Sequence, residues 1–151
     1  MRTINRKINL IVIHCSATRV DKDYTPEQLE RDHKARGFNS AGYNYYKSGE
    51  IVSMRPLELI PAHVTGYNKN SIGICYEGGL DPDGNPDDTR TEAQRQSIIR
   101  LLLDLVVQFP DSRICGHRDL SPDLNGNGKI EPDEWMKMCP CFNAEEEYRN
   151  I

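Results

Sequence analysis

The chain has 151 residues, of which 37% are hydrophobic and 28% are charged, and its formal net charge at pH 7 is -4. This composition is typical of a folded globular protein, and the length suits one domain but not two ordinary ones, so we predict a single domain over residues 1–151. Acidic and basic residues are interspersed, which gives no electrostatic reason to expect nucleic acid or an anionic membrane as the main partner.

The N-terminal region contains no recognisable export signal or membrane anchor. Its apolar run, Leu10–Ile13, is far too short to cross a bilayer, is followed by His14 and lacks a small-residue cleavage site. The five cysteines are an odd number, and Cys139 and Cys141 are too close in sequence for a favourable bridge. We therefore expect synthesis in the cytoplasm, no membrane insertion and reduced thiols.

The first strand and the first helix are predicted from hydrophobicity and capping residues. Residues Asn9–Cys15 are almost continuously apolar, as in a central strand that is buried on both faces. Thr25, Pro26 and Gln28 provide an N-cap, a first-turn proline and a capping box. A helix is therefore predicted from this point to Gly37.

Three further strands and one long loop are predicted in the middle of the chain. Tyr43–Lys47 and Glu50–Arg55 have strand character and are joined by a turn at Ser48-Gly49, and Ser71–Tyr76 is a further strand. The segment Gly78–Asp88 is rich in Gly, Asp and Pro and is predicted to be a loop.

A second helix is predicted after Thr91, which forms a capping box with Gln94. Its apolar residues cover an arc too wide for a surface stripe, so we expect a helix that is deeply packed against the sheet and ends near Phe109. These apolar residues are Ile98, Ile99, Leu101, Leu102, Leu103, Leu105, Val106 and Val107.

The last predicted elements are a short strand at Arg113–Gly116 and a short helix after Asn143, which has Glu146 three residues later. Strands and helices are mixed along the whole chain. This order predicts an α/β fold in which helices pack on a sheet.

Three potential metal ligands are indicated by residue type and setting. His14 and His117 each lie at the end of a predicted buried strand, and Cys139 precedes Pro140 in a segment rich in turn residues. Strand ends on a rigid sheet can hold ligands with the accuracy that a metal site requires. Two imidazoles and one thiolate leave a fourth zinc position open, as in catalytic sites. Each residue alone is more readily a core side chain, so the prediction depends on the three together.

Five segments of the sequence resemble the type 2 N-acetylmuramoyl-L-alanine amidases, which include the phage lysozyme-type zinc amidases and share their fold with the peptidoglycan recognition proteins. The similarity runs in the same order from about His14 to Phe142. Several blocks in register are far more specific than any one of them. The five segments are Ile13–Thr18, Gly42–Tyr45, Gly66–Gly73, Gly116–Asp119 and Lys137–Pro140.

This resemblance implies a zinc enzyme that hydrolyses the amide between the lactyl group of N-acetylmuramic acid and the L-alanine of the stem peptide. It also implies a central mixed β-sheet flanked by helices, with zinc at the base of a cleft. The implied ligands are His14, His117 and Cys139. Position alone leaves Cys141 open as the thiolate, and Cys139 is chosen because it precedes a proline, as the family ligand does.

The resemblance also implies that Tyr43 and Lys137 are the catalytic pair. Lys137 lies two residues from a ligand and can bring a positive charge to the developing oxyanion; the alternative is an ordinary solvated surface lysine. Tyr43 can donate a hydrogen bond, or it can be an ordinary half-buried tyrosine. His63 and Asn68 are candidates for substrate binding, and a purely structural role for His63 is equally open.

An insertion at about residues 120–136 departs from the phage lysozyme pattern. It contains Asp123–Glu134, which satisfies the EF-hand loop pattern with oxygen ligands at positions one, three and five, glycine at six and glutamate at twelve. The candidate calcium ligands are Asp123, Asn125, Asn127, Lys129 and Glu134. A polar insertion loop is the alternative, and no clear helix precedes the loop.

The expected partner is peptidoglycan, and the favoured setting is a phage or prophage endolysin that acts on the wall after synthesis in the bacterial cytoplasm. A host remodelling enzyme and a delivered toxin remain alternatives. A non-catalytic recognition module ranks below the enzyme because Cys139 and Lys137 are both present. Regulation of a phage RNA polymerase has no support in this sequence. The oligomeric state stays open, with a monomer as the expectation.

Overall fold

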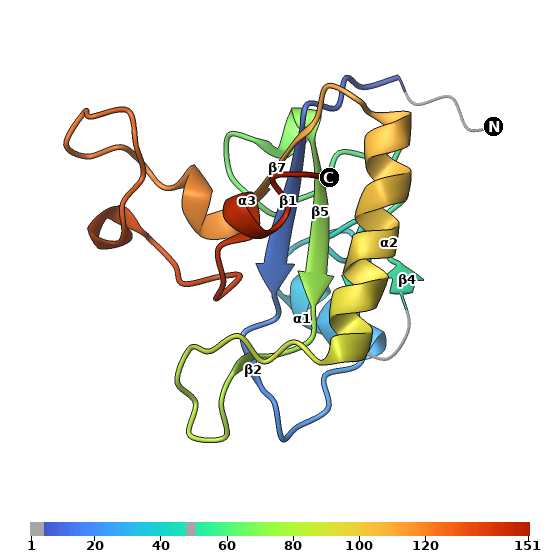
Figure 1. Ribbon diagram of the computed structural model, residues 1–151. Helices are drawn as coiled ribbons and strands as arrows, with labels where there is room; N and C mark the ends of the chain where they lie inside the picture. The colour runs from blue at the N-terminus through green and yellow to red at the C-terminus, as the bar shows by residue number, and fades with distance from the viewer. Residues whose placement is uncertain (1–4, 48–50) are drawn as a thin grey trace.

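The computed structural model describes residues 5–47 and 51–151, and it is built around one five-stranded sheet (Figure 1). The strand order is β4-β3-β5-β1-β7. Strands β3, β5, β1 and β7 are parallel, whereas β4 runs antiparallel to β3, so the predicted mixed sheet is confirmed. The strands are β1 (Leu10–Cys15), β3 (Tyr45–Lys47), β4 (Ile51–Ser53), β5 (Ser71–Tyr76) and β7 (Arg113–Gly116).

Alternation along β1 divides the sheet into two faces. Ile11 and Ile13 pack in the main core, which also contains Leu102 of helix α2 (Glu92–Gln108). Val12 packs instead in a separate cluster on the other face. His14 is two residues after Val12 and lies on the same face of the sheet, because successive side chains of a strand point to opposite faces. His14 therefore points away from α2, towards the face on which the site is built.

Helix α1 (Pro26–Ala35) packs on this second face through Leu29, which lies in a cluster with Tyr46 and Cys75. The predicted capping box at its N-terminus is present. The helix ends two residues before the predicted limit, and Gly37 has a φ of 96°. Glycine adopts this left-handed conformation without the steric cost that other residues bear, which allows the chain to turn there.

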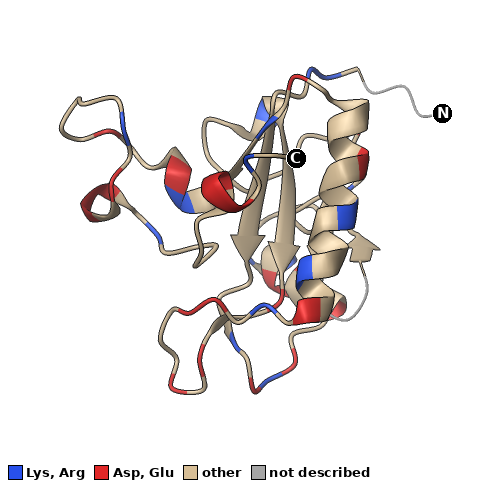
Figure 2. Ribbon diagram, in the orientation of Figure 1, with Lys and Arg blue, Asp and Glu red and all other residues tan. Residues whose placement is uncertain are grey.

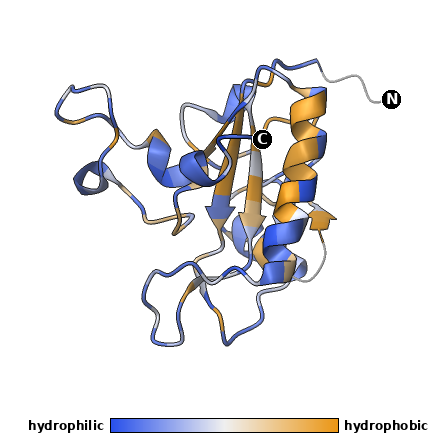
Figure 3. Cartoon of the chain, viewed as in Figure 1, coloured by the Kyte–Doolittle hydropathy of each residue, from blue (hydrophilic) through white to orange (hydrophobic). Residues whose placement is uncertain are grey.

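Helix α2 begins with the predicted capping box at Thr91, but the expectation that it is buried around a wide arc is wrong. Figure 3 shows hydrophobic colour along most of α2. Ile98, Leu102 and Leu105 are buried, whereas three other apolar side chains of the helix are exposed. The reason is that α2 forms an outer layer, so only one face of it is covered. The outward side chains are Ile99 at 37%, Leu103 at 49% and Val107 at 80% exposure.

The remaining elements are short. The predicted loop 78–88 contains β6 (Gly79–Leu80), which pairs in parallel with β2 (Thr18–Arg19), and neither strand is predicted from the sequence. The predicted turn at Ser48-Gly49 lies outside the described residues. Along residues 5–47 and 51–151, none of the helices has both the length and the apolar character needed to span a membrane.

The C-terminal helix α3 (Ala144–Glu147) is joined to the body by a buried arginine. The Arg90 guanidinium donates to both carboxylate oxygens of Asp88 and of Glu147 and to the hydroxyl of Tyr148. It also lies over the ring of Phe142, 3.3 Å from the centroid. The buried Arg90 charge is thus balanced by two carboxylates, as a buried cation requires.

Candidate metal centre

The two histidines of the predicted metal centre meet because their strands are neighbours. Strands β1 and β7 are parallel, with Ile13 opposite Gly116, so the residues that follow these positions lie at the same edge of the sheet. His14 is in β1, and His117 begins the 3-10 turn directly after β7. Their rings are 4.7 Å apart, centroid to centroid.

Cys139 completes this donor set from a segment far along the chain. One ligand atom from each of His14, His117 and Cys139 lies within 4.8 Å of the others. The Arg118 N–H donates to the Cys139 carbonyl at 2.9 Å, and the Cys15 N–H donates to the Cys139 sulfur at 3.1 Å. These two hydrogen bonds fix both the backbone and the sulfur of Cys139 beside the histidines.

Cys141 lies in a different environment. Its Sγ is 4.0 Å from the Cys15 sulfur and 3.4 Å from the carbonyl oxygen of Gly79. Hydrogen bonding to Cys15, followed by burial, raises the pKa of the Cys141 thiol. The structure thus brings Cys139, and not Cys141, to the two histidines.

The imidazoles at the centre are neutral near pH 7. Burial, and then the charges of His63 and His117, lower the pKa of His14 well below its ordinary value. Burial lowers the pKa of His117 to about 4 and that of His63 to about 3. A neutral imidazole has a free lone pair, which is the form that binds a metal ion.

A groove of about 800 Å³ lies over this centre. His117 and Cys139 line it, whereas His14 is only 1% exposed and lies beneath its floor. Segments from widely separated parts of the chain line the groove. Its other lining residues include Tyr24, Asp32, Arg36, Val64, Thr65, Leu120 and Met136.

Tyr43 and Lys137, the catalytic pair that the resemblance implies, both line the groove. The Tyr43 ring packs against His14 with centroids 4.8 Å apart. Burial raises the pKa of the Tyr43 hydroxyl well above its ordinary value, so this group stays a neutral hydrogen-bond donor. Lys137 is exposed and lies in the segment that leads to Cys139.

His63 is in direct contact with the metal centre. Its Nδ1 is 2.7 Å from His14 Nε2, and its Nε2 is 2.7 Å from Ser71 Oγ. Asn68 also lines the groove, but its Oδ1 accepts hydrogen bonds from the backbone N–H groups of His63 and Val64, each at 2.9 Å. Asn68 therefore holds the His63 segment in place.

Sequence reasoning missed Ser71, Gly73 and the groove wall from α1. A Cβ on Gly73 would lie 2.8 Å from His63 Nδ1, so the absence of a side chain makes room for that ring. The alternation along β5 is the signal that could have placed Gly73 on the site face. His33 of α1 also lines the groove, and it accepts a hydrogen bond from the Gly42 N–H at 2.7 Å.

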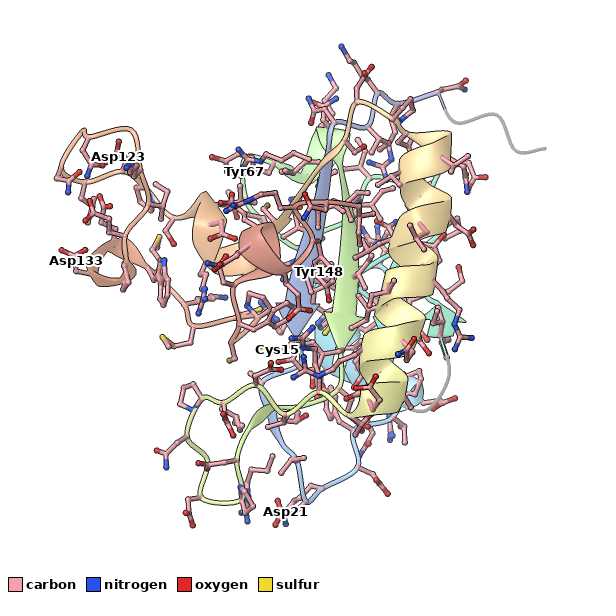
Figure 4. All side chains as sticks on the ribbon, in the orientation of Figure 1. Cys15, Asp21, Tyr67, Asp123, Asp133 and Tyr148 are labelled. Atoms are coloured by element: carbon pink, nitrogen blue, oxygen red, sulfur yellow. The ribbon has the colours of Figure 1, made fainter. Side chains whose placement is uncertain are left out.

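The acidic loop, defined here as residues 121–136, begins and ends at the groove, which Ser121 and Met136 line, and its middle part projects away from the metal centre. It extends from the body beside β7, and Asp123 and Asp133 lie at its outer part (Figures 1 and 4). Acidic residues recur along it, whereas β1 and β5 carry almost no charge in the same view (Figure 2). Asp123 accepts from the N–H groups of Gly126 and Gly128, at 3.0 and 2.7 Å.

Glu134 ties the two ends of the acidic loop together. Its side chain is buried, and its carboxylate accepts from the N–H groups of Leu124, Asn125 and Glu131. The next residue, Trp135, packs under the Arg118 guanidinium, 3.8 Å from its ring centroid. The loop is thereby connected to the residue that follows His117.

Comparison with known proteins gives one family and several relatives. A family model described as N-acetylmuramoyl-L-alanine amidase matches residues 4–134. This segment contains His14, Tyr43 and His117, and Lys137 and Cys139 follow directly after it. An uncharacterized protein of Haemophilus influenzae is 52% identical over 96 residues, which are 64% of this chain and 83% of that protein.

Two further relatives carry functional names. The chain is similar to an endolysin of Klebsiella phage KP32, with 32% identity over 143 residues that cover 93% of this chain and 85% of that protein. Among solved structures, the N-acetylmuramoyl-L-alanine amidase LysC from Clostridium intestinale URNW has a TM-score of 0.70 at 26% identity, covering 95% of this chain and 83% of that chain. Sequence and fold therefore point to the same family.

Proposed function

The chain belongs to the N-acetylmuramoyl-L-alanine amidase family, and within it we propose a zinc-dependent endolysin whose metal is held by His14, His117 and Cys139. The protein is thus a peptidoglycan amidase, a hydrolase of the bond between N-acetylmuramic acid and the L-alanine of the stem peptide. The single observation that carries the metal assignment is the convergence of these three donors within 4.8 Å beneath the groove.

The donor set fits zinc in both type and number. Two neutral imidazoles and one sulfur are borderline and soft ligands, and three protein ligands leave a position for water or substrate. Because His117 and Cys139 line the groove, an ion that they held would be reachable from the space where substrate can enter. Zinc bound here would supply a Lewis acid that activates water and polarises the scissile carbonyl.

We assign the hydrogen-bonding and charged roles to Tyr43 and Lys137. The neutral Tyr43 hydroxyl can donate to the substrate carbonyl oxygen, because its raised pKa keeps the proton in place. The Lys137 ammonium can stabilise the negative charge that develops on this oxygen during attack. Both act in the groove, where the walls exclude part of the solvent and strengthen such interactions.

His63 and Asn68 line the same groove, so we propose that they form part of the wall that contacts the bound muropeptide. Their existing hydrogen bonds limit this role. The Oδ1 of Asn68 is already occupied by two backbone N–H groups, which leaves its amide N–H₂ as the group to offer a substrate.

Release of stem peptides from purified peptidoglycan, followed by mass spectrometry, tests the proposed function. We expect native protein to release free peptides that begin with L-alanine, and we expect a strong chelator or Cys139→Ser to abolish this release. Cys141→Ser is the matched control and should retain activity, because Cys141 contacts Cys15 and Gly79 instead. Full activity of Cys139→Ser would overturn the ligand assignment.

A non-catalytic recognition module is the alternative within the same fold. The presence of Cys139 beside both histidines favours the enzyme, since a module that only binds muropeptide does not need a catalytic metal. Zinc-loaded protein that sediments with peptidoglycan but releases no peptide would favour the module.

We also propose that the acidic loop binds calcium through Asp123, Asn125, Asn127, Lys129 and Glu134. The motif supports this assignment, because EF-hand loops use positions one, three, five, seven and twelve in this way, with a backbone carbonyl at seven. Gly128, at the sixth position, has a φ of 81°, which suits the sharp turn required there. A bound ion would clamp the loop that leads to Lys137 and Cys139.

Calorimetric titration of the zinc-loaded protein with Ca²⁺ tests the calcium proposal. We expect binding heat and a higher melting temperature, since an ion that binds only the folded state stabilises it. Asp123→Ala should remove both effects. Absence of heat together with an unchanged melting temperature would overturn the proposal.

The biological setting is part of the proposal. We infer that the protein is made in the bacterial cytoplasm, acts on the cell wall after release or delivery, and works as a monomer. Expression in Escherichia coli tests this inference: lysis should require co-expression of a membrane-permeabilising protein. Size-exclusion chromatography with light scattering should give the mass of one chain, and a dimer mass would overturn the monomer.

A further inference from the structure

A continuous row of hydrogen bonds runs from the metal centre into the protein. His14 Nε2 lies 2.7 Å from His63 Nδ1, and His63 Nε2 lies 2.7 Å from Ser71 Oγ. The Ser71 hydroxyl in turn lies 3.4 Å from the carbonyl oxygen of Asn68. The row therefore joins four polar groups in sequence, and it begins at a proposed metal ligand.

The last group of this row gives one consistent direction for the hydrogen bonds in it. A carbonyl oxygen can only accept, so we assign the Ser71 hydroxyl as its donor, and Ser71 then accepts from His63 Nε2–H. A neutral imidazole has one N–H and one lone pair, so Nδ1 of His63 must accept. The donor to that atom is His14 Nε2–H. His14 then has its lone pair on Nδ1.

The protein holds this row rigidly from several sides. Ser71 is fully buried at the start of β5. Asn68 Oδ1 fixes the backbone of His63 through two N–H groups, and the missing side chain of Gly73 gives the His63 ring its space. These contacts fix the orientation of the ring as well as its place.

We propose that the Asn68 carbonyl, Ser71 and His63 form a directed hydrogen-bond chain that fixes the tautomer of His14, so that Nδ1 is the atom available to the metal. This proposal rests on the zinc centre proposed above and names the residues that prepare one of its ligands. His63 is a positioning residue, because it acts through His14. Partners of this kind typically change metal affinity by about 10–100-fold when they are removed.

The first measurement is zinc affinity, determined by competition with a chelating dye. We expect His63→Leu to weaken zinc binding by about 10–100-fold, since His14 then loses the partner that selects its tautomer. His63→Asn is the matched control: the Asn Oδ1 can take the place of Nδ1 as an acceptor, so it should restore most of the affinity. Equal zinc affinity for His63→Leu and wild type would overturn the proposal.

The second measurement is the tautomer of His14 itself, read from ¹⁵N–¹H correlation spectra of the metal-free protein. Wild type should show the proton on Nε2, and Ser71→Ala should shift the ring towards a mixture of tautomers. A proton on Nδ1 of wild-type His14 would overturn the proposal. This spectrum tests the hydrogen-bond chain even if wild type fails to bind zinc, an outcome that would overturn only the proposed metal centre.

Melting temperatures of the metal-free variants separate positioning from folding. If His63→Leu lowers the melting temperature but leaves both zinc affinity and the His14 tautomer unchanged, then His63 has only a structural role and the proposal is wrong. We expect instead that the metal-free variants melt close to wild type, whereas their zinc affinity and the tautomer of His14 change.

Discussion

The metal centre and the acidic loop are two candidate cation sites that are constructed in opposite ways. The donors of the metal centre come from His14, His117 and Cys139, which are far apart in sequence and meet only when β1, β7 and the C-terminal segment are assembled. The candidate ligands of the acidic loop all lie between Asp123 and Glu134, and they are held by hydrogen bonds within the loop.

This difference predicts how each site responds to change. The metal centre depends on the packing of the sheet, so damage to the core should weaken it. The acidic loop depends on local contacts such as those of Glu134, and it is joined to the body by the packing of Trp135 on Arg118. It should therefore respond to changes in its own residues far more than to changes in the core.

The largest expected contrast is between two leucines. Leu102 is fully buried in the main core, so Leu102→Ala should cost about 2–5 kcal/mol of unfolding free energy. Leu124 in the acidic loop is 73% exposed, so Leu124→Ala should change stability by no more than about 0.5 kcal/mol. Urea unfolding of the metal-free protein measures both. A large loss in Leu124→Ala would show that the loop unfolds together with the core.

A second contrast concerns catalysis. Lys137→Ala should lower kcat/KM by about 100-fold or more, as expected for a group that stabilises developing charge, while zinc affinity stays unchanged. Asp133→Ala, in the acidic loop, is the control and should leave the rate unaltered. The measurement is the initial rate of stem-peptide release. If Lys137→Ala retains the wild-type rate, Lys137 is an ordinary surface lysine.

Many of the helices and strands could be predicted from the sequence, because the patterns that indicate them lie within short segments. The apolar run of β1, the capping boxes of α1 and α2, and the strand β7 are all present as expected. The calcium-loop pattern was also recognisable, because all its candidate ligands lie within the short segment Asp123–Glu134. A pattern that is complete within twelve residues needs no knowledge of the fold.

The parts that could not be predicted depend on contacts between distant segments. Nothing local distinguishes Ser71 from any other serine at the start of a strand, and its hydrogen bond to His63 exists only in the folded chain. The exposure of Val107 on α2 has the same origin, since hydrophobicity does not reveal that no further layer covers the helix. The short pair β2 and β6 likewise depends on pairing across the fold.

A third contrast concerns acid stability. Hydrogen bonds from Arg90 hold the pKa of Glu147 below its ordinary value of 4.5, and the same arginine, against the effect of burial, lowers the pKa of Asp88 from 3.8. A carboxylate with a lowered folded pKa stabilises the fold above its unfolded pKa and loses this contribution as pH falls through the folded value. Stability should therefore decrease below about pH 4.5, by at most about 1.4 kcal/mol per pH unit for each group, and by less where solvent screens the charge.

The acidic loop provides the control for this acid dependence. Hydrogen bonds from Asn125 and then Asn127 lower the pKa of Glu131, but these partners lie within the loop. Unfolding free energy should be followed from pH 6 to pH 3 in wild type, Arg90→Met and Glu131→Gln. Arg90→Met should flatten the dependence, whereas Glu131→Gln should flatten it only slightly, because the Glu131 carboxylate lies at the surface, where solvent screens its interactions. An unchanged slope in Arg90→Met would assign the acid sensitivity to other carboxyl groups.

The smallest expected effect tests whether the two regions are coupled at all. Trp135 packs on Arg118, whose N–H donates to the Cys139 carbonyl, so a stiffer acidic loop should hold Cys139 more firmly. An interaction of this kind contributes about 0.5–1 kcal/mol, so Ca²⁺ should raise zinc affinity by roughly two- to fivefold, and Trp135→Leu should abolish the increase. Because such coupling is reciprocal, zinc should raise calcium affinity by the same factor. If neither ion affects the other, the acidic loop is an independent site.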